Sequence, residues 1–217
     1  MRLLASETSA AANQSLASEE ADRQPMIVAI GGTTKPGSST ELALKAGVTS
    51  IEETGARSLS FDGAFLASLP HYRPGLATRT PEERQFLDAV RRADGMLIAS
   101  PAYHGGVSAL VKNAIDLLEE TAKDPRPYLE GLPVGLIVTA HGWQAIGVTL
   151  SSFRGIVHAL RGWPTPLGVG INVATTQVFR SDGACVDHAI VAQLQLMAQQ
   201  IVQFSSHRVR SNGKSCL

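Results

Sequence analysis

The sequence predicts an α/β fold in which a five-stranded parallel sheet carries helices on both faces. Short apolar runs such as Met26–Ile30 alternate along the chain with segments of helical periodicity. Runs that are apolar throughout are typical of strands buried on both faces. Five such β–α units follow one another, which favours parallel strands joined by crossover helices. Loops rich in glycine and polar residues follow several of these strands, at the edge where ligands bind in such sheets.

Five segments are predicted to be strands, each bounded by glycine, proline or polar residues. Gly31-Gly32 ends the first of them, and Gly55 precedes the second. The predicted strands are Met26–Ile30, Arg57–Phe61, Met96–Ser100, Pro133–Ala140 and Thr165–Val173.

Helices are predicted between and after these strands. Glu41 follows Ser38 by three residues, as in a capping box. Thr80 and Pro81 form a second helix start, with threonine as N-cap and proline at the first helical position. The connection from Asp62 to Thr80 is expected to be irregular and is long enough to be either functional or disordered. The predicted helices are Leu42–Glu53, Pro81–Ala93, Val107–Thr121, a segment after Gly147 that reaches Leu160, and Ala184–Ser206.

One domain with a substantial core is expected from 217 residues. Residues 1–24, rich in Ala, Ser and Glu, are predicted to form a disordered or loosely helical N-terminal tail. A helical arm that packs on a partner subunit is the alternative. Residues 25–207 are predicted to form the domain, and residues 208–217 a frayed C-terminal tail.

Composition argues against several classes of protein. Lys+Arg and Asp+Glu both number 19, so no overall basic field attracts nucleic acid, and 5% aromatic content disfavours a stacking surface for single strands. No apolar run approaches the roughly 20 residues that span a membrane. Cys185 and Cys216 have neither a disulfide-framework nor a metal-ligand spacing, so we expect no metal site and a cytoplasmic protein.

The loop after the first strand, G-G-T-T-K-P-G-S-S-T, favours one of the two common doubly wound arrangements. It lacks the G-x-G-x-x-G of a dinucleotide fold and the G-K-[ST] of a P-loop. Its hydroxyl groups suit a single phosphate monoester at a helix N-terminus. We therefore predict a flavodoxin-like fold with strand order 2-1-3-4-5. The candidate phosphate ligands are Thr33, Lys35, Ser38, Ser39 and Thr40; the alternative is that the hydroxyls only cap the helix and Lys35 is solvated.

Two further loops complete the predicted flavin nucleotide site. The loop Ser100–Gly106 combines an aromatic ring, an imidazole and two glycines, and can lie flat against a planar ligand. The candidates in it are Pro101, Ala102, Tyr103, His104, Gly105 and Gly106, with packing as the alternative for Tyr103 and solvent exposure for His104. The loop after the fourth strand adds His141, Gly142 and Trp143, for which packing within the loop is the alternative.

The first two loops together resemble the NAD(P)H-dependent FMN reductase family over about Met26 to Val173. The family's loop G-S-x-R-x-x-S-x-[NT] is matched with Thr33 and Lys35 where serine and arginine are usual, so the phosphate meets a point charge in place of a bidentate fork. The family's second loop, P-x-Y-[HN]-G-[SG] followed by L-K-N-x-[IL]-D, is also present. The matched positions are Gly32, Thr33, Lys35, Ser38 and Thr40, then Pro101, Tyr103, His104, Gly105, Gly106 and Val111–Asp116.

The resemblance implies an oxidoreductase that binds FMN, takes a hydride from NADPH or NADH at flavin N5, and reduces free flavin, a quinone or a similar small molecule. It also implies a homodimer or homotetramer. No catalytic acid or base is assigned, because the cofactor carries the chemistry. A flavodoxin-like electron carrier and a non-catalytic flavodoxin-like module are the alternatives. Arg73, Arg79 and Arg84 are open between recognition of a 2′-phosphate and ordinary surface positions.

Overall fold

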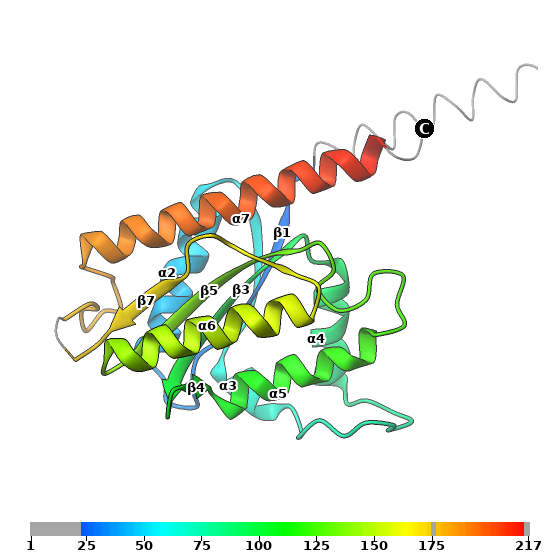
Figure 1. The fold of residues 1–217 in the computed structure, drawn as a ribbon, viewed down its shortest axis with the longest axis horizontal. Helices are drawn as coiled ribbons and strands as arrows, with labels where there is room; N and C mark the ends of the chain where they lie inside the picture. Colours follow the sequence, from blue (N-terminus) through cyan, green and yellow to red (C-terminus); the bar gives the residue numbers. More distant parts are fainter. Residues whose placement is uncertain (1–22, 175–176, 215–217) are drawn as a thin grey trace, which may run out of the picture.

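The fold is a three-layer sandwich of helices, sheet and helices, seen in a computed structural model that describes residues 23–174 and 177–214 (Figure 1). The parallel strands follow the order β2-β1-β3-β5, and both β6 and β7 pair with β5 at the far edge. This confirms the predicted flavodoxin-like order. The strands are β1 (Met26–Gly31), β2 (Arg57–Phe61), β3 (Gly95–Tyr103), β4 (Gly106–Val107), β5 (Pro133–Ala140), β6 (Trp163–Pro164) and β7 (Val169–Asn172).

Helices cover both faces of the sheet. Helices α2 and α7 lie on one face, and α3, α4, α5 and α6 lie on the other (Figure 1). The 3₁₀ helix η1 continues α5. The helices are α2 (Ser39–Glu53), α3 (Gly63–Ser68), α4 (Pro81–Arg92), α5 (Ala109–Leu117), η1 (Leu118–Thr121), α6 (Trp143–Ala159) and α7 (His188–Lys214).

Strand β1 shows why continuous apolar runs form this sheet. Ile27 and Ala29 pack into the core beneath α2 and α7, whereas Val28 and Ile30 pack into the core on the opposite face. All four side chains are fully buried. Because side chains alternate between the two faces of a strand, a strand buried on both faces must be apolar at every position.

The two predicted helix starts are confirmed. Ser38 is the N-cap of α2, and its hydroxyl accepts from the amide of Glu41 at 3.3 Å. Glu41 bonds to the amide of Gly37 in place of the N-cap amide, so the predicted capping box is shifted by one residue. Thr80 and Glu83 form a complete capping box at the start of α4, with Pro81 as its first residue.

The predicted fifth strand, Thr165–Val173, is wrong in its bounds: within it only Val169–Asn172 form a strand, β7, and the two-residue strand β6 (Trp163–Pro164) lies before it. Residues of β6 pair with the start of β5, residues of β7 pair with its end, and the chain leaves the sheet between them. Pro166 has no N–H to donate to the ladder. Arg154 instead bonds to the carbonyl groups of Thr165 and Pro166 at 3.0 and 2.9 Å.

Four other elements differ from the prediction. Strand β3 runs to Tyr103 and turns back as β4, where an irregular loop is expected from the sequence. Helix α3 occupies part of the connection predicted to be irregular. Helix α6 begins at Trp143, before Gly147, and α7 begins at His188 and continues to Lys214 through residues predicted to fray. The predicted N-terminal tail lies almost entirely outside the described residues. Among the described helices, none is both long and apolar enough to cross a membrane.

Candidate functional site

A cavity of about 550 Å³ opens at the carboxyl ends of β1, β3, β5 and β7, where parallel α/β sheets bind ligands. Eleven of the fourteen predicted site residues line it: Thr33, Lys35, Ser38, Ser39, Thr40, Pro101, Ala102, Tyr103, His104, His141 and Gly142. Gly105, Gly106 and Trp143 lie outside it. Five lining residues were not predicted from the sequence: Gly37, Thr139, Ala140, Ala145 and Val173.

The loop after β1 is held in shape by its own polar groups. The Thr33 hydroxyl accepts from the amide of Lys35 at 3.1 Å and lies 3.3 Å from the Lys35 carbonyl oxygen, to which it donates. Ser38 caps α2 by accepting, which leaves its O–H free to donate to a ligand because a hydroxyl both donates and accepts. The loop therefore offers a donor hydroxyl at Ser38 without giving up the helix cap.

The N-terminus of α2 makes this end of the cavity suited to an anion. The amides of Ser39 and Thr40, in the first turn, have no acceptor within the helix, and the helix dipole is positive here. Lys35 adds a cationic side chain at the cavity. The nearby carboxylate of Glu41 is bound to the amide of Gly37 and to Lys45 at 2.5 Å, and it does not line the cavity.

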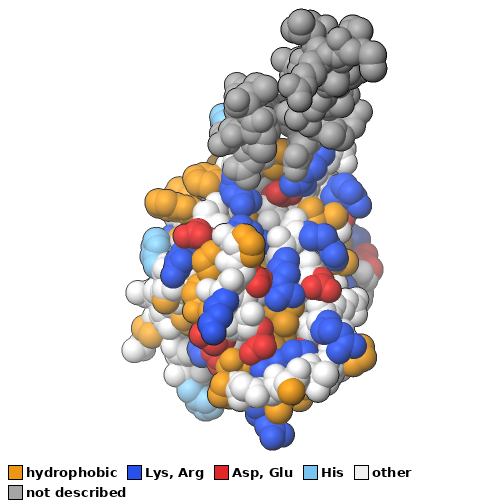
Figure 2. All heavy atoms as spheres, turned by 90° about the vertical axis from the view of Figure 1, so that its right-hand side faces the viewer, with side chains coloured by type: hydrophobic (Ala, Val, Ile, Leu, Met, Phe, Trp, Pro, Cys, Tyr) orange, Lys and Arg blue, Asp and Glu red, His pale blue; other side chains and the backbone are white. Residues whose placement is uncertain are grey.

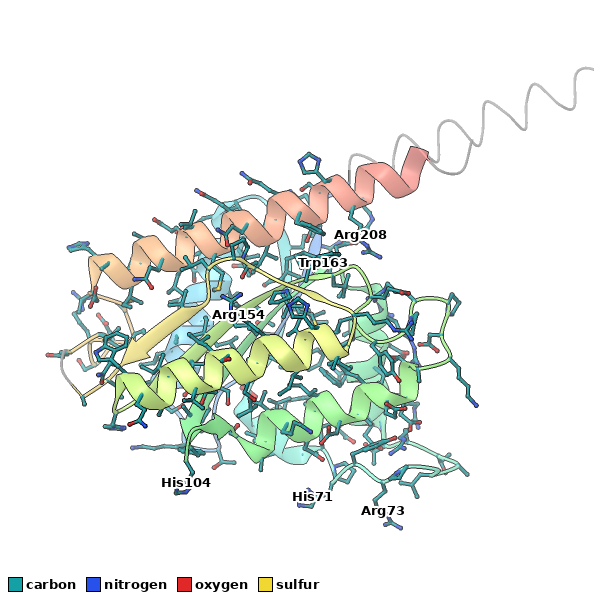
Figure 3. All side chains as sticks on the ribbon, in the orientation of Figure 1. His71, Arg73, His104, Arg154, Trp163 and Arg208 are labelled. Atoms are coloured by element: carbon teal, nitrogen blue, oxygen red, sulfur yellow. The ribbon has the colours of Figure 1, made fainter. Side chains whose placement is uncertain are left out.

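The hairpin of β3 and β4 forms a second wall. Its turn consists of His104 and Gly105, both with positive φ (53° and 77°), as a two-residue type I′ turn requires. Tyr103 is 60% exposed at the cavity, and His104 lies at the tip of the hairpin (Figure 3). Neither Gly105 nor Gly106 lines the cavity. Gly105 takes the positive φ of the turn, and Gly106 pairs with Tyr103 across the hairpin.

The third wall is the loop that joins β5 to α6. The buried hydroxyl of Thr139 is hydrogen-bonded to that of Thr40 at 2.6 Å, which connects this wall to the α2 N-terminus. Gly142 is the N-cap of α6 and provides no side-chain cap, so the first-turn amides of α6 are available at this wall. Trp143 is the first residue of that helix and is 63% exposed outside the cavity.

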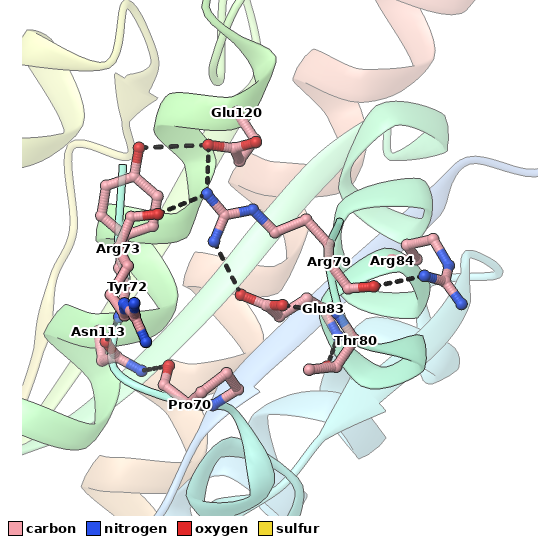
Figure 4. A network of polar contacts seen from close by, with 9 residues as sticks. All are labelled: Pro70, Tyr72, Arg73, Arg79, Thr80, Glu83, Arg84, Asn113 and Glu120. Atoms are coloured by element: carbon pink, nitrogen blue, oxygen red, sulfur yellow. Dashed lines mark hydrogen bonds and ion pairs between the residues drawn. The ribbon is translucent and has the colours of Figure 1, made fainter. Parts of the chain in front are cut away.

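Two of the three arginines before and at the start of α4, Arg79 and Arg84, donate hydrogen bonds within the protein (Figure 4). Arg79 is buried and bonds to Glu83 at 3.1 Å and Glu120 at 2.7 Å, and also to the carbonyl group of Arg73. Arg84 donates to the carbonyl group of Arg79. Arg79 therefore fixes the segment before α4 and is not available to a ligand's phosphate.

The connection that precedes Arg79 is also fixed to α5. The side chain of Asn113 accepts from the amide of Tyr72 at 2.8 Å and donates to the carbonyl group of Pro70 at 2.9 Å. Lys112 and Asp116, on the same helix, form an i,i+4 ion pair at 2.6 Å, with both side chains nearly half exposed. Asn113 thus has a structural role that the motif alone does not reveal.

The chemistry available in the cavity is binding and orientation. Among the described residues, no aspartate or glutamate lines the cavity, and no cluster of His, Cys, Asp and Glu could hold a metal ion. Donor groups gather at the N-terminus of α2, and the N-terminus of α6 and the ring of Tyr103 border the same cavity. Such a site can hold a ligand with an anionic end and a planar polar body.

Comparison with known proteins agrees with this geometry. The family model for NADPH-dependent FMN reductase matches residues 25–176. An FMN-dependent NADPH-azoreductase of Staphylococcus haemolyticus is 29% identical over 123 residues, which are 56% of this chain and 61% of the relative. A quinone reductase of Pseudomonas putida is 30% identical over 103 residues, or 45% of this chain and 51% of that protein. The chain thus spans about half to three fifths of these relatives' length.

Solved structures support the fold. A flavoenzyme NAD(P)H:acceptor oxidoreductase from Paracoccus denitrificans superposes with a TM-score of 0.67 at 18% identity, covering 84% of this chain and 98% of the other. A flavodoxin from the domain Archaea gives a TM-score of 0.57 at 11% identity, covering 84% of this chain and all of the other. The family match covers most of the chain and confirms the resemblance seen in its two loops: the protein belongs to the NADPH-dependent FMN reductase family.

Proposed function

We propose that the protein is an FMN-dependent NAD(P)H oxidoreductase that reduces a small-molecule acceptor such as a free flavin, a quinone or an azo compound. The observation that carries the proposal is the single cavity that joins an anion-binding helix N-terminus to an exposed aromatic ring at the sheet's carboxyl edge. Family membership and the activities of the azoreductase and quinone reductase relatives support it.

The α2 end of the cavity fits the phosphate of FMN. The amides of Ser39 and Thr40, the free O–H of Ser38 and the charge of Lys35 together favour a phosphate dianion. The hydroxyl of Thr40 is bonded to Thr139, so we assign Thr40 to the site through its amide. The absence of a carboxylate among the described lining residues avoids repulsion of that dianion.

The other two walls fit the flavin ring. Tyr103 and His104 border one side, and the residues from Thr139 to Gly142 border another. The first-turn amides of α6 favour negative charge on the part of the ring that lies near them. When bound, FMN supplies the two-electron chemistry between the nicotinamide donor and the acceptor. The protein's own contribution is to bind, orient and polarise.

The experiment that tests the proposal is steady-state oxidation of NADPH and of NADH by the FMN-loaded protein, with a benzoquinone or free FMN as acceptor. We expect consumption that requires both FMN and the protein, faster with one nicotinamide than with the other. An electron carrier would not oxidise NADPH without a separate reductase. Absence of FMN-dependent turnover with both donors would contradict the proposal.

We also propose that the protein is a homodimer or homotetramer and that it works in the cytoplasm. A groove of about 320 Å³ between α5 and α6 is lined by half-buried apolar residues such as Ile156 and Leu160 beside Lys112 and Asp116. This groove supports α5 as part of a subunit interface. Sedimentation velocity tests the proposed interface: a monomer at micromolar concentration would contradict the assignment.

The cytoplasmic assignment rests on the two cysteines and their spacing.

A further inference from the structure

A second cavity, of about 620 Å³, lies at the opposite end of the sheet, where β1 and β2 begin. Six arginines line it, together with Asp94 and a few apolar side chains that include Met26 and Leu59. We call it the arginine pocket. Figure 2 faces this end of the molecule and shows several Lys and Arg side chains, with Asp and Glu side chains between them. The arginines are Arg23, Arg57, Arg91, Arg92, Arg126 and Arg208.

Separate parts of the chain bring these arginines together. Arg57 begins β2, Arg91 and Arg92 end α4, and Arg126 comes from the loop before β5. Arg208 comes from α7 (Figure 3). Along the sequence it lies more than one hundred residues from every other arginine of the pocket but Arg126. The fold, and not a run of basic sequence, therefore creates the concentration of positive charge.

Carboxylates compensate only part of this charge. Asp94 binds Arg23 through two hydrogen bonds of 2.6 and 2.8 Å, and Arg91 pairs with Asp88 and Asp124. Within the part of the chain that the structure describes, the remaining four arginines form no ion pair with a carboxylate. The pocket thus keeps an excess of cationic groups.

Arg126 shows this excess most clearly. Its Nη2 donates to the carbonyl groups of Val90 and Arg91 at 2.5 and 2.8 Å and so caps the end of α4. Its Nη1 is buried and has no hydrogen-bond partner among the described residues. Burial lowers the pKa of Arg126 and the charge of Arg208 lowers it further, against the opposite effect of the carboxylates of Asp94, Asp124 and Glu130. A buried donor without a partner is costly, so Arg126 holds its charge at the pocket without full compensation from the protein.

We propose that the arginine pocket is a binding site for a phosphate-bearing small molecule, distinct from the cavity at the other end of the sheet. Guanidinium groups recognise phosphate through charge-assisted, often bidentate hydrogen bonds. Arginines that approach from several directions suit a tetrahedral polyanion better than a flat carboxylate. The apolar surface of Met26, Leu59 and Ala89 leaves room for an organic portion of an ester.

The test is isothermal titration calorimetry of the FMN-loaded full chain with inorganic pyrophosphate at low salt. FMN occupancy prevents the probe from reporting on the site at α2. We expect one pyrophosphate per chain, bound more weakly as salt is added. Arg57→Ser and Arg208→Ser should each weaken binding about tenfold, because each removes one charge-assisted contact. These two variants spare Arg126, whose loss would uncap α4.

Arg73→Ser is the matched control, since it removes the same charge from a loop far from the pocket (Figure 3) and should leave pyrophosphate affinity unchanged. No binding, or equal losses in all three variants, would overturn the proposal. The same titration on a chain that lacks residues 1–22 tests whether the acidic stretch Glu19–Asp22 of the same chain occupies the pocket in place of a ligand. Binding that appears only after this truncation would also overturn the proposal and assign the pocket to the chain itself.

Discussion

Replacement of Lys35 and Ser38 by alanine tests the phosphate end of the proposed FMN site. Lys35 is exposed, so its charge-assisted contact with a phosphate belongs at the lower end of the usual range, about 1.5 kcal/mol. The O–H of Ser38, a neutral donor to the same phosphate, adds about 1 kcal/mol. The double variant should therefore bind FMN about 30- to 150-fold more weakly, measured by fluorescence titration of the apoprotein.

Ser38 also caps α2, so a separate measurement must distinguish lost binding from lost stability. Ser38→Ala should lower the free energy of unfolding by about 1 kcal/mol through the cap alone. Thr80→Ala is the matched control, because Thr80 caps α4 in the same way and does not line the cavity. It should lose similar stability and keep its FMN affinity. Unchanged FMN affinity in the Lys35/Ser38 double variant would refute the placement of the phosphate.

Three further substitutions or reactions test the structure around the site. Gly31→Ala places a Cβ 2.3 Å from the carbonyl oxygen of Ala99 and should lower the free energy of unfolding, measured in urea, by about 3 kcal/mol. Gly55→Ala has open space at its Cβ and should lower it by about 1 kcal/mol. Equal losses would contradict the close packing of β1 against β3. Arg79→Met leaves the buried carboxylate of Glu83 without its cation and should lower the free energy of unfolding by about 3 kcal/mol or more. Arg91→Met, at exposed ion pairs, should lower it by less than about 1 kcal/mol. A small loss of stability in Arg79→Met would show that the buried pair contributes little. Burial raises the pKa of the Cys185 thiol. At pH 8, iodoacetamide should therefore modify this thiol more slowly in the folded protein than in denaturant, as measured by mass spectrometry. Equal rates would contradict the partial burial of Cys185.

Local signals in the sequence were sufficient for the regular part of the fold. The apolar run of β1 and the Thr80-Pro81 start of α4 are each determined by neighbouring residues, and both predictions are confirmed. The chain leaves the sheet between β6 and β7, where Arg154 binds the carbonyl groups of Thr165 and Pro166, eleven and twelve residues away. Such a contact is set by the packing of α6 and is not visible in the periodicity of the strand itself.

The candidate site shows the same division. Polar residues in the loops were found because their type indicates binding, whereas Ala140, Ala145 and Val173 line the cavity through position alone. The sequence predicts that the glycines of the hairpin allow close approach of a ligand, whereas in the structure Gly105 occupies a positive-φ position of a two-residue turn. The hairpin signal in the sequence is weak, because His104-Gly105 stands where Asn-Gly or Asp-Gly marks a type I′ turn most clearly.

The central claim is that this chain binds FMN and passes electrons to it from a nicotinamide. The most direct measurement is the visible spectrum of the purified protein with added FMN, followed under anaerobic conditions as NADPH and then NADH are supplied. The account predicts flavin absorption that is shifted by binding and then bleaches with at least one donor. A protein that leaves the FMN spectrum unshifted, or whose bound FMN stays oxidised with both donors, would contradict it.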